Sequence, residues 1–353
     1  MVYFAAAILL LFVQMPHQQW SNMKLLAFII PYFGVLPKEM EYFLLTTNYN
    51  PDYTWIIITD DCTQYDYPSN VIVIRKNFSE IQSQIQKKFD FPIALNHPKK
   101  LCDFKPAYGY IFDEELKEFE YWGYCDLDQY FGDLSHWLTK SYLRQYDRVF
   151  ALGHMTIYRN ISRINRLFME TDLRDNISLR SYKDVFSNEK NLSFDEIPES
   201  RVNINTIATQ QQIRQSFDWF AADILPFRSN FIESFCDVRN MQWSSSPPKT
   251  SLIVFWENGR IYLLERKADG FQKREVLYVH IQKRKLRMKK SASGVNAFLI
   301  MPNRIIPITT EKLTQTVNGL FRKNKYRKML HVDESSSRLI AAKNIVIHKF
   351  KLY

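Results

Sequence analysis

The chain has 353 residues, a formal net charge of +10 and an aromatic content of 15%. This length allows one large α/β domain with an extension, or two domains. The positive charge favours partners that carry phosphate, such as a nucleoside diphosphate, a nucleic acid or an anionic membrane. Four scattered cysteines argue against a zinc knuckle and a disulfide framework, and they suit a reducing compartment.

The first 22 residues differ in character from the rest of the chain. Residues 2–13 are apolar, but this run is too short to span a bilayer, and no Lys or Arg precedes it as in a signal peptide. Met23 begins a stretch that reads like a natural protein start. We expect residues 1–22 to be either the result of a mis-assigned start or a weak membrane-associating leader. Mass spectrometry of the native N-terminal peptide decides between them.

Apolar runs predict buried strands in the first part of the chain. Residues 24–30 form such a run, which Pro31 ends, and residues 55–59 and 71–74 form two more. Helical patterns separate the strands. This alternation predicts an α/β fold with a mostly parallel open sheet.

Three helices are expected in the same part of the chain. Residues 79–82 fit a capping box at the start of the first. Asp103 is placed to cap the second, which should run through Leu116 and end near Phe119. Residues 134–143 have the pattern of the third.

A further strand is predicted at residues 148–157, where Gly153 and His154 interrupt the apolar pattern. A glycine inside a strand often marks the close approach of a ligand or of another backbone. Residues 171–215 are polar, and we expect loops and short helices there that could cover an acceptor site.

A hairpin is predicted at residues 251–265, because the dipeptide Asn258-Gly259 favours a type I′ turn. Another strand, at residues 276–279, ends next to His280. From residue 286 onwards the chain is basic, with alternating apolar and cationic residues.

Asp126 and Asp128 follow an aromatic strand candidate. In an extended chain, residues i and i+2 lie on the same face, so both carboxylates should point the same way while Leu127 enters the core. Two such carboxylates repel each other unless a cation lies between them, and oxygen ligands suit Mg²⁺ or Mn²⁺. The pair predicts a metal site, with a solvated loop as the simpler alternative.

Ligands of parallel α/β sheets bind outside the carboxyl ends of the strands. Several polar or aromatic side chains are predicted at such ends: Tyr32, Phe33, Asp60, Asp61, Asp126 and Asp128. Their convergence favours a ligand site at this edge of the sheet.

The order of the motifs resembles one known family. Ile-Ile-Pro-Tyr-Phe-Gly comes first, and Asp60-Asp61 follows. Lys-Leu-Cys-Asp-Phe-Lys-Pro-Ala-Tyr-Gly, Tyr-Trp-Gly-Tyr-Cys-Asp-Leu-Asp and Val-His-Ile-Gln-Lys-Arg come next. Over residues 24–285 the chain looks like a bacterial family of GT-A-type glycosyltransferases, largely uncharacterised and associated with exopolysaccharide and capsule gene clusters.

This resemblance implies a GT-A-like α/β fold with a Rossmann-like, nucleotide-sugar-binding half and a small antiparallel hairpin region. It implies a catalytic domain at residues 23–285, preceded by the leader at residues 1–22. A basic C-terminal extension would occupy residues 286–353.

The resemblance also implies roles for single residues. Mn²⁺ or Mg²⁺ would be bound by Asp126, Asp128 and His280. The nucleotide sugar would be contacted by Pro31, Tyr32, Phe33, Asp60, Asp61, Asp103, Lys105 and Lys283. For several of these, simpler alternatives exist: a strand-end turn for the Asp60-Asp61 pair, a helix cap for Asp103 and a solvated side chain for Lys105.

The sequence does not decide which carboxylate would be catalytic. Asp223 is the best placed by its order along the chain, and Asp195 and Glu196 are alternatives. His154 could contact the donor sugar. An inverting enzyme would use the carboxylate as a base, and a retaining enzyme would use it as a nucleophile or stabiliser.

The implied reaction transfers a sugar from a nucleotide-diphosphate sugar, with a UDP-sugar as the first expectation, to a glycan or lipid-linked acceptor in surface-polysaccharide synthesis. The expected location is the cytoplasm, including the inner face of the cell membrane. The alternatives are a basic protein that binds an anionic membrane or nucleic acid, and a non-catalytic homologue. The chain has no recognisable nucleic-acid-binding motif, so nucleic acid is not the expected partner.

Overall fold

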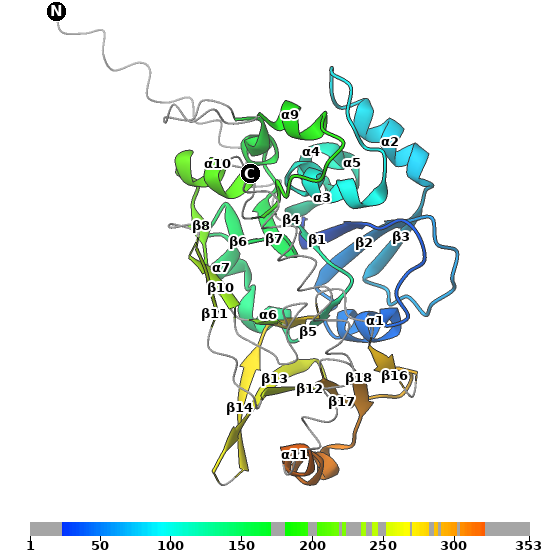
Figure 1. The fold of residues 1–353 in the computed structure, drawn as a ribbon, viewed down its shortest axis with the longest axis vertical. Helices are drawn as coiled ribbons and strands as arrows, with labels where there is room; N and C mark the ends of the chain where they lie inside the picture. The colour runs from blue at the N-terminus through cyan, green and yellow to red at the C-terminus, as the bar shows by residue number, and fades with distance from the viewer. Residues whose placement is uncertain are drawn as a thin grey trace, which may run out of the picture.

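The computed structural model describes residues 23–170, 181–196, 203–218, 221–223, 234–237, 242–245, 252–268, 270–281, 286–288, 291–301 and 304–321. The predicted leader lies outside these residues, as does most of the basic extension. The fold is α/β, with a large sheet between two layers of helices and a second sheet below it in Figure 1. Within the described residues, no helix is long and apolar enough to cross a membrane.

The large sheet has seven strands in the order β3-β2-β1-β4-β7-β6-β8. They are β1 (Lys24–Pro31), β2 (Tyr53–Thr59), β3 (Val71–Arg75), β4 (Phe119–Cys125), β6 (Arg148–Leu152), β7 (Met155–Arg159) and β8 (Gln215–Ser216). Strands β3, β2, β1 and β4 are parallel, and β7 is antiparallel to both β4 and β6. The α/β class, the mostly parallel sheet and its first three apolar strands are therefore confirmed.

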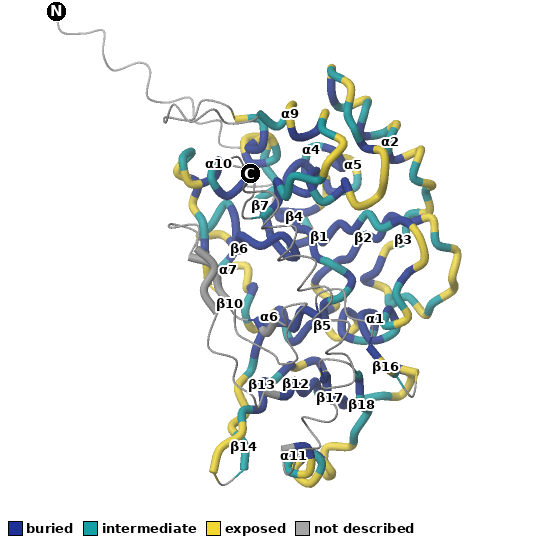
Figure 2. The backbone as a smooth tube through the Cα atoms, in the orientation of Figure 1, coloured by how far each residue is buried: buried dark blue, intermediate teal, exposed yellow. Residues whose placement is uncertain are grey.

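The centre of this sheet is buried on both faces. In β1, Ala27 and Ile29 belong to one apolar cluster, whereas Phe28 and Ile30 belong to another. Successive strand residues point to opposite faces, so a strand covered on both sides needs an uninterrupted apolar run. Figure 2 shows β2 and β4 as buried along their length and β1 as buried except at its ends.

Most helices pack on the first of these faces. They are α2 (Phe78–Gln86), α3 (Leu101–Phe104), α4 (Tyr108–Ile111), α5 (Asp113–Leu116), α8 (Ser162–Asn165), α9 (Tyr182–Phe186) and α10 (Ile204–Gln210), with the 3₁₀ turns η2 (Pro98–Lys100), η3 (Lys105–Ala107) and η4 (Leu167–Met169). The opposite face is covered by α1 (Met40–Asn48), α6 (Leu134–Trp137) and α7 (Lys140–Leu143).

The second sheet has six strands in the order β14-β13-β12-β17-β18-β16. They are β12 (Leu252–Glu257), β13 (Arg260–Lys267), β14 (Gly270–Val276), β16 (Arg287–Met288), β17 (Ala297–Met301) and β18 (Arg304–Pro307). Tyr42 of α1 packs with Trp256 on one face of this sheet. On the other face, Val317 packs with Phe255. Val317 lies in α11 (Leu313–Phe321), which follows η5 (Thr310–Lys312).

The predicted boundary at residue 285 falls inside this second sheet. β12 is antiparallel to β17, so residues 254–257 pair with residues 297–300. The strands on both sides of residue 285 thus share one set of backbone hydrogen bonds. The predicted boundary therefore does not separate this sheet from the part of the chain before it.

Two small sheets complete the fold. β10 (Ser234–Asp237) pairs with β11 (Gln242–Ser245). In the other, β5 (Gln129–Phe131) and β9 (Ala221–Asp223) flank β15 (Tyr278–His280). The predicted hairpin is confirmed as β12 and β13, and its turn residues Asn258 and Gly259 have the positive φ angles of 45° and 85° that a type I′ turn needs.

The predicted starts of two helices were wrong. The capping box of α2 is made by Asn77 rather than Ser79, because the Asn77 side chain accepts from Glu80 N at 3.0 Å and Glu80 returns a bond to Asn77 N. Asp103 does not cap a helix, since it lies inside α3 and is fully buried. The single helix expected from Asp103 to near Phe119 is instead divided into the short helices α3, α4 and α5 and the 3₁₀ turn η3, and Phe119 begins β4.

Two elements that were predicted to be continuous are each divided in two. The helix predicted at residues 134–143 is α6 and α7, because the chain leaves helical geometry at Leu138 and Thr139 starts a new helix by accepting a hydrogen bond from Tyr142 N. The strand predicted at residues 148–157 is the hairpin of β6 and β7, which turns at Gly153 and His154.

Candidate metal centre

Asp126 and Asp128 lie in the turn between β4 and β5, at the edge of the sheet where the parallel strands β1, β2 and β4 end. Leu127 between them is buried, as predicted. The backbone N–H of Asp126 donates to the side chain of Gln129 at 3.0 Å, which closes the turn. The two carboxylates therefore converge through a tight turn rather than through an extended chain.

His280 reaches these carboxylates from a distant part of the sequence. Strand β15 is antiparallel to β5, and this register places His280 opposite Gln129. The next residue, Ile281, donates its N–H to the carbonyl of Asp128 at 2.9 Å. The Nε2 atom of His280 lies 3.4 Å from Oδ1 of Asp128.

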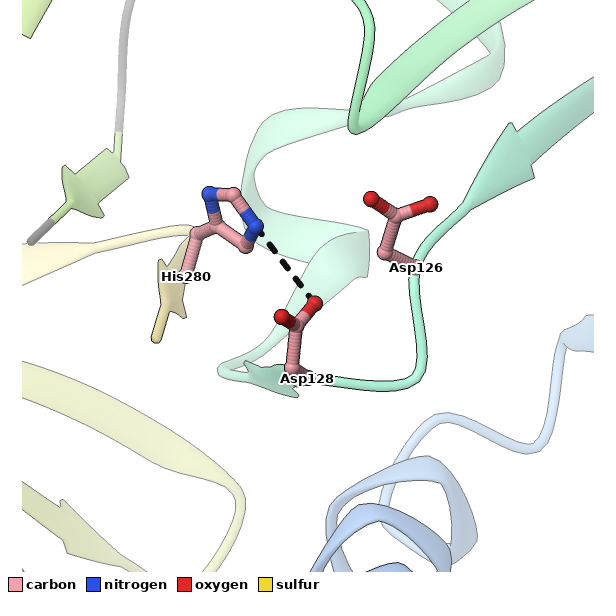
Figure 3. A group of neighbouring side chains, drawn as sticks. All are labelled: Asp126, Asp128 and His280. Atoms are coloured by element: carbon pink, nitrogen blue, oxygen red, sulfur yellow. Dashed lines mark ion pairs between the residues drawn. The ribbon is translucent and has the colours of Figure 1, made fainter. Parts of the chain in front are cut away.

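One ligand atom from each of Asp126, Asp128 and His280 lies within 4.8 Å of the others. Figure 3 shows the two carboxylates and the imidazole around a common space. Both carboxylates are partly exposed, while the histidine is buried. Two carboxylate oxygens and one imidazole nitrogen could hold a divalent metal ion and leave positions for other ligands.

Lys105 lies beside this group. Its Nζ atom donates to Oδ1 of Asp126 at 2.8 Å and to the carbonyl oxygen of Gly153 at 2.5 Å, and it lies 3.6 Å from Asp195. Burial alone would lower the pKa of Lys105, but the neighbouring carboxylates, Asp126 first, outweigh burial and hold that pKa well above its usual value. Lys105 is therefore a buried cation at the candidate centre.

Asp195 is fully enclosed on the other side of Lys105. Burial raises the pKa of this carboxyl well above its usual range, against the opposing effect of Lys105. Glu196 follows, with its side chain against Gly153: a Cβ atom at that glycine would lie 2.6 Å from Oε2 of Glu196. The close approach predicted at Gly153 is thus made by a side chain from residues 191–196.

Asp103 holds this segment in place. Its carboxylate accepts from the backbone N–H groups of Leu192 at 2.9 Å and Phe194 at 3.0 Å. It also pairs with Lys100 at 2.7 Å, and both side chains are fully buried. Asp103 is therefore a buried support for residues 192–194, with none of its surface exposed.

The loop after β1 is held by the acids that end β2. Asp60 accepts from Gly34 N at 2.7 Å and Asp61 accepts from Leu36 N at 2.5 Å. Bonds from Thr63 and from the Leu36 backbone lower the pKa of Asp61. Both acids are thus engaged in shaping this loop, which fits the strand-end alternative.

The aromatic residues of this loop differ in position. Phe33 is buried and packs edge-on against Phe78, with ring centroids 5.3 Å apart, so it belongs to the core. Pro31 and Tyr32 remain partly exposed at the strand end. Burial, and next the charge of Asp128, raise the pKa of Tyr32.

His154 lies against His280, with ring centroids 4.0 Å apart. The backbone of Asp223 pairs with His280 through β9, but its side chain lies outside the described part of the structure, and so does all of Lys283. Sequence analysis missed two contributors, the Gln129 side chain and the hydroxyl of Tyr278, because nothing in the sequence distinguishes them from ordinary strand residues.

Residues 28–309 match the model of a family of unknown function, DUF6625. The chain belongs to the DUF6625 family. The match begins within β1 and ends after β18, so it includes both large sheets and all members of the candidate metal centre. No curated protein matches this DUF6625 chain.

Proposed function

We propose that this DUF6625 protein is a metal-dependent glycosyltransferase with a GT-A-like fold. It would transfer a sugar from a nucleotide-diphosphate sugar, with a UDP-sugar as the first donor to test. The observation that carries the proposal is the meeting of Asp126, Asp128 and His280 at the edge of the sheet where the parallel strands end. The motif resemblance over residues 24–285 supports the same reaction.

The chemistry requires positive charge where the leaving group departs. Sugar transfer breaks the bond between the anomeric carbon and a phosphate oxygen, and negative charge then builds on the nucleoside diphosphate. A divalent ion held by Asp126, Asp128 and His280 would supply Lewis acidity there. The chain's own contribution is to hold these ligands together before the substrate arrives.

Lys105 also contributes positive charge in this proposal. Its buried ammonium group already neutralises Asp126 at 2.8 Å, so the site does not carry two uncompensated carboxylates. A cation fixed at this depth also adds to the positive potential that diphosphate oxygens meet. Pro31 and Tyr32, at the end of β1, are the exposed residues from which nucleotide recognition would begin.

The acceptor in this proposal is a glycan or a lipid-linked sugar used in surface-polysaccharide synthesis. A lipid-linked acceptor would place the protein in the cytoplasm and, in part, at the inner face of the cell membrane. The basic residues after 321, which lie outside the described part of the chain, would then contact anionic lipid. Co-sedimentation of the full chain and of a chain truncated after Phe321, which keeps the second sheet and α11, with anionic vesicles tests this: equal binding by both refutes it.

The test of the reaction has two stages. A thermal-shift screen of nucleoside diphosphates with and without Mn²⁺ should identify a nucleotide that stabilises the protein only when Mn²⁺ is present. Donor hydrolysis and transfer are then measured with the matching nucleotide sugar. Asp128→Asn should lower kcat/KM by about 100-fold or more, because it removes one charged ligand.

Asp66→Asn is the matched control, since Asp66 is an exposed aspartate outside the candidate centre. It should leave kcat/KM unchanged. Undiminished Mn²⁺-dependent activity in Asp128→Asn would refute the metal assignment.

A further inference from the structure

Two histidines from distant parts of the chain stack at the candidate centre. The rings of His154 and His280 have centroids 4.0 Å apart and planes inclined by only 19°. Both residues are buried, with 8% and 5% of their surface exposed. The His280 ring therefore has one face covered by another flat ring, which restricts its rotation.

His154 is itself held by the strand that carries His280. Its Nε2 atom is hydrogen-bonded to the hydroxyl of Tyr278 at 2.8 Å. Tyr278 and His280 are two residues apart in β15, so their side chains lie on the same face of that strand. Tyr278, His154 and His280 thus form one buried packing unit.

The backbone of His154 also contacts the other side of the candidate centre. The carbonyl of His154 accepts a hydrogen bond from the N–H of Asp126 at 3.1 Å. The turn at Gly153 and His154 consequently contacts both the Asp turn and the histidine strand.

We propose that His154 is a positioning residue, whose ring fixes the imidazole of His280 for binding a divalent cation beside Asp126 and Asp128. The inference rests on the metal centre of the proposed function. His154 is not a member of the group whose ligand atoms lie within 4.8 Å of one another, and its Nε2 atom bonds to Tyr278. In this proposal it therefore acts through His280 rather than as a ligand of the ion.

The physical reason is pre-organisation. A histidine that rotates freely must lose that freedom when it binds a metal, which weakens binding. Residues behind the ligands of metal sites typically change metal affinity by about 10- to 100-fold when removed. A ring of similar shape should keep most of this effect even without nitrogen atoms, because stacking restricts rotation through shape.

Isothermal titration of Mn²⁺ into the full chain tests the inference. His154→Ala should weaken Mn²⁺ binding by about tenfold, at the lower end of the range for residues behind metal ligands. The double variant His154→Phe/Tyr278→Phe keeps two stacked rings and removes both partners of the hydrogen bond, so it leaves neither one unsatisfied. It should bind Mn²⁺ within about threefold of the wild type.

Two reference variants complete the series. His280→Ala should abolish specific binding. His136→Ala is the matched control, because His136 is an exposed histidine that also packs against an aromatic ring, that of Trp137, in α6. It should bind Mn²⁺ like the wild type.

Three results would overturn the inference. Unchanged affinity in His154→Ala would show that the stack has no role. An equal loss in His154→Ala and in the double variant would show that the nitrogen atoms of His154, not its shape, are needed, as for a direct ligand. Absence of Mn²⁺ binding by the wild type would remove the metal centre of the proposed function as well, so failure of the inference alone is distinguishable from failure of both.

Discussion

The ammonium group of Lys105 lies 2.8 Å from the carboxylate of Asp126. One acid of the candidate centre thus has a positive partner supplied by the chain itself. A divalent ion bound by Asp126 and Asp128 would also neutralise Asp126, as Lys105 does. Protein stability and cation binding should therefore be linked through Lys105.

Substitution of Lys105 tests this link. Lys105→Met leaves Asp126 and the buried Asp195 without their shared cation, which should lower the free energy of unfolding by about 3 kcal/mol in the absence of metal. Mn²⁺ should then raise the melting temperature of Lys105→Met more than that of the wild type, because the ion replaces the missing charge. Calorimetry with and without Mn²⁺ measures both effects.

Lys88→Met is the control for Lys105→Met. Lys88 pairs with Asp113 at 2.6 Å, but both side chains are partly exposed, so its removal should cost less than about 1 kcal/mol. Equal stability of the two variants, or an equal Mn²⁺ response in Lys105→Met and the wild type, would contradict the link.

We predict that position 153 must be glycine, because the side chain of Glu196 covers it. A Cβ atom there would lie 2.6 Å from Oε2 and 2.9 Å from Cβ of Glu196. Gly153→Ala should therefore push residues 191–196 away and lower the free energy of unfolding by about 2 kcal/mol, as overpacking does elsewhere. Adding Glu196→Gly removes these two atoms and Cδ, which would lie at 2.8 Å, and should recover most of the loss.

The comparison for Gly153→Ala is Gly319→Ala. Gly319 lies in α11, and a Cβ atom there meets nothing within 4 Å. Alanine should stabilise this helix by up to about 1 kcal/mol, because glycine loses more backbone entropy on folding. Chemical denaturation measures all three variants. A Gly153→Ala protein as stable as the wild type would show that Glu196 does not need this space.

The pH dependence of stability should reveal the ion pair at the start of β6. Asp147 accepts from Nε and Nη2 of Arg214 at 3.0 and 2.8 Å. Burial would raise the pKa of Asp147, but Arg214, with help from Arg159, outweighs burial and lowers it. A lowered pKa means that the unfolded chain binds the proton more tightly, so the contribution to stability exists above the unfolded value of about 4 and disappears as pH falls through the folded value.

Asp147→Asn should consequently cost about 1 kcal/mol at pH 7, as expected for a bidentate but partly exposed pair. Urea denaturation from pH 7 down to pH 3 should show the wild type and the variant converging below pH 4. A difference that stays constant over this range would mean that the charge of Asp147 does not contribute.

Sequence reasoning succeeded where one local signal determines the structure. The apolar run of β1 is explained by burial on two faces, and Asn258-Gly259 forms the turn that its backbone preferences require. It failed where a polar side chain has several possible partners. Asn77 and Ser79 both suit a helix start, and only the three-dimensional chain path selects Asn77.

The same limit applies to the candidate centre. Asp126 and Asp128 are two residues apart, so their closeness could be expected from sequence, but the tight turn that brings their carboxylates together was not expected. The placement of His280 depends on the pairing of β15 with β5, which involves residues far apart in the chain. The positions of Asp103 and Asp195 depend on how residues 191–196 fold back, and no spacing in the sequence encodes that contact.

The most direct test of the metal centre is a crystal of the full chain soaked in Mn²⁺, with diffraction measured at the manganese absorption edge. The proposal predicts an anomalous peak between the carboxylates of Asp126 and Asp128 and the imidazole of His280, at about 2.2 Å from the nearest ligand oxygen, as expected for a small divalent ion. A map with no peak there, or with manganese bound only elsewhere, would contradict it.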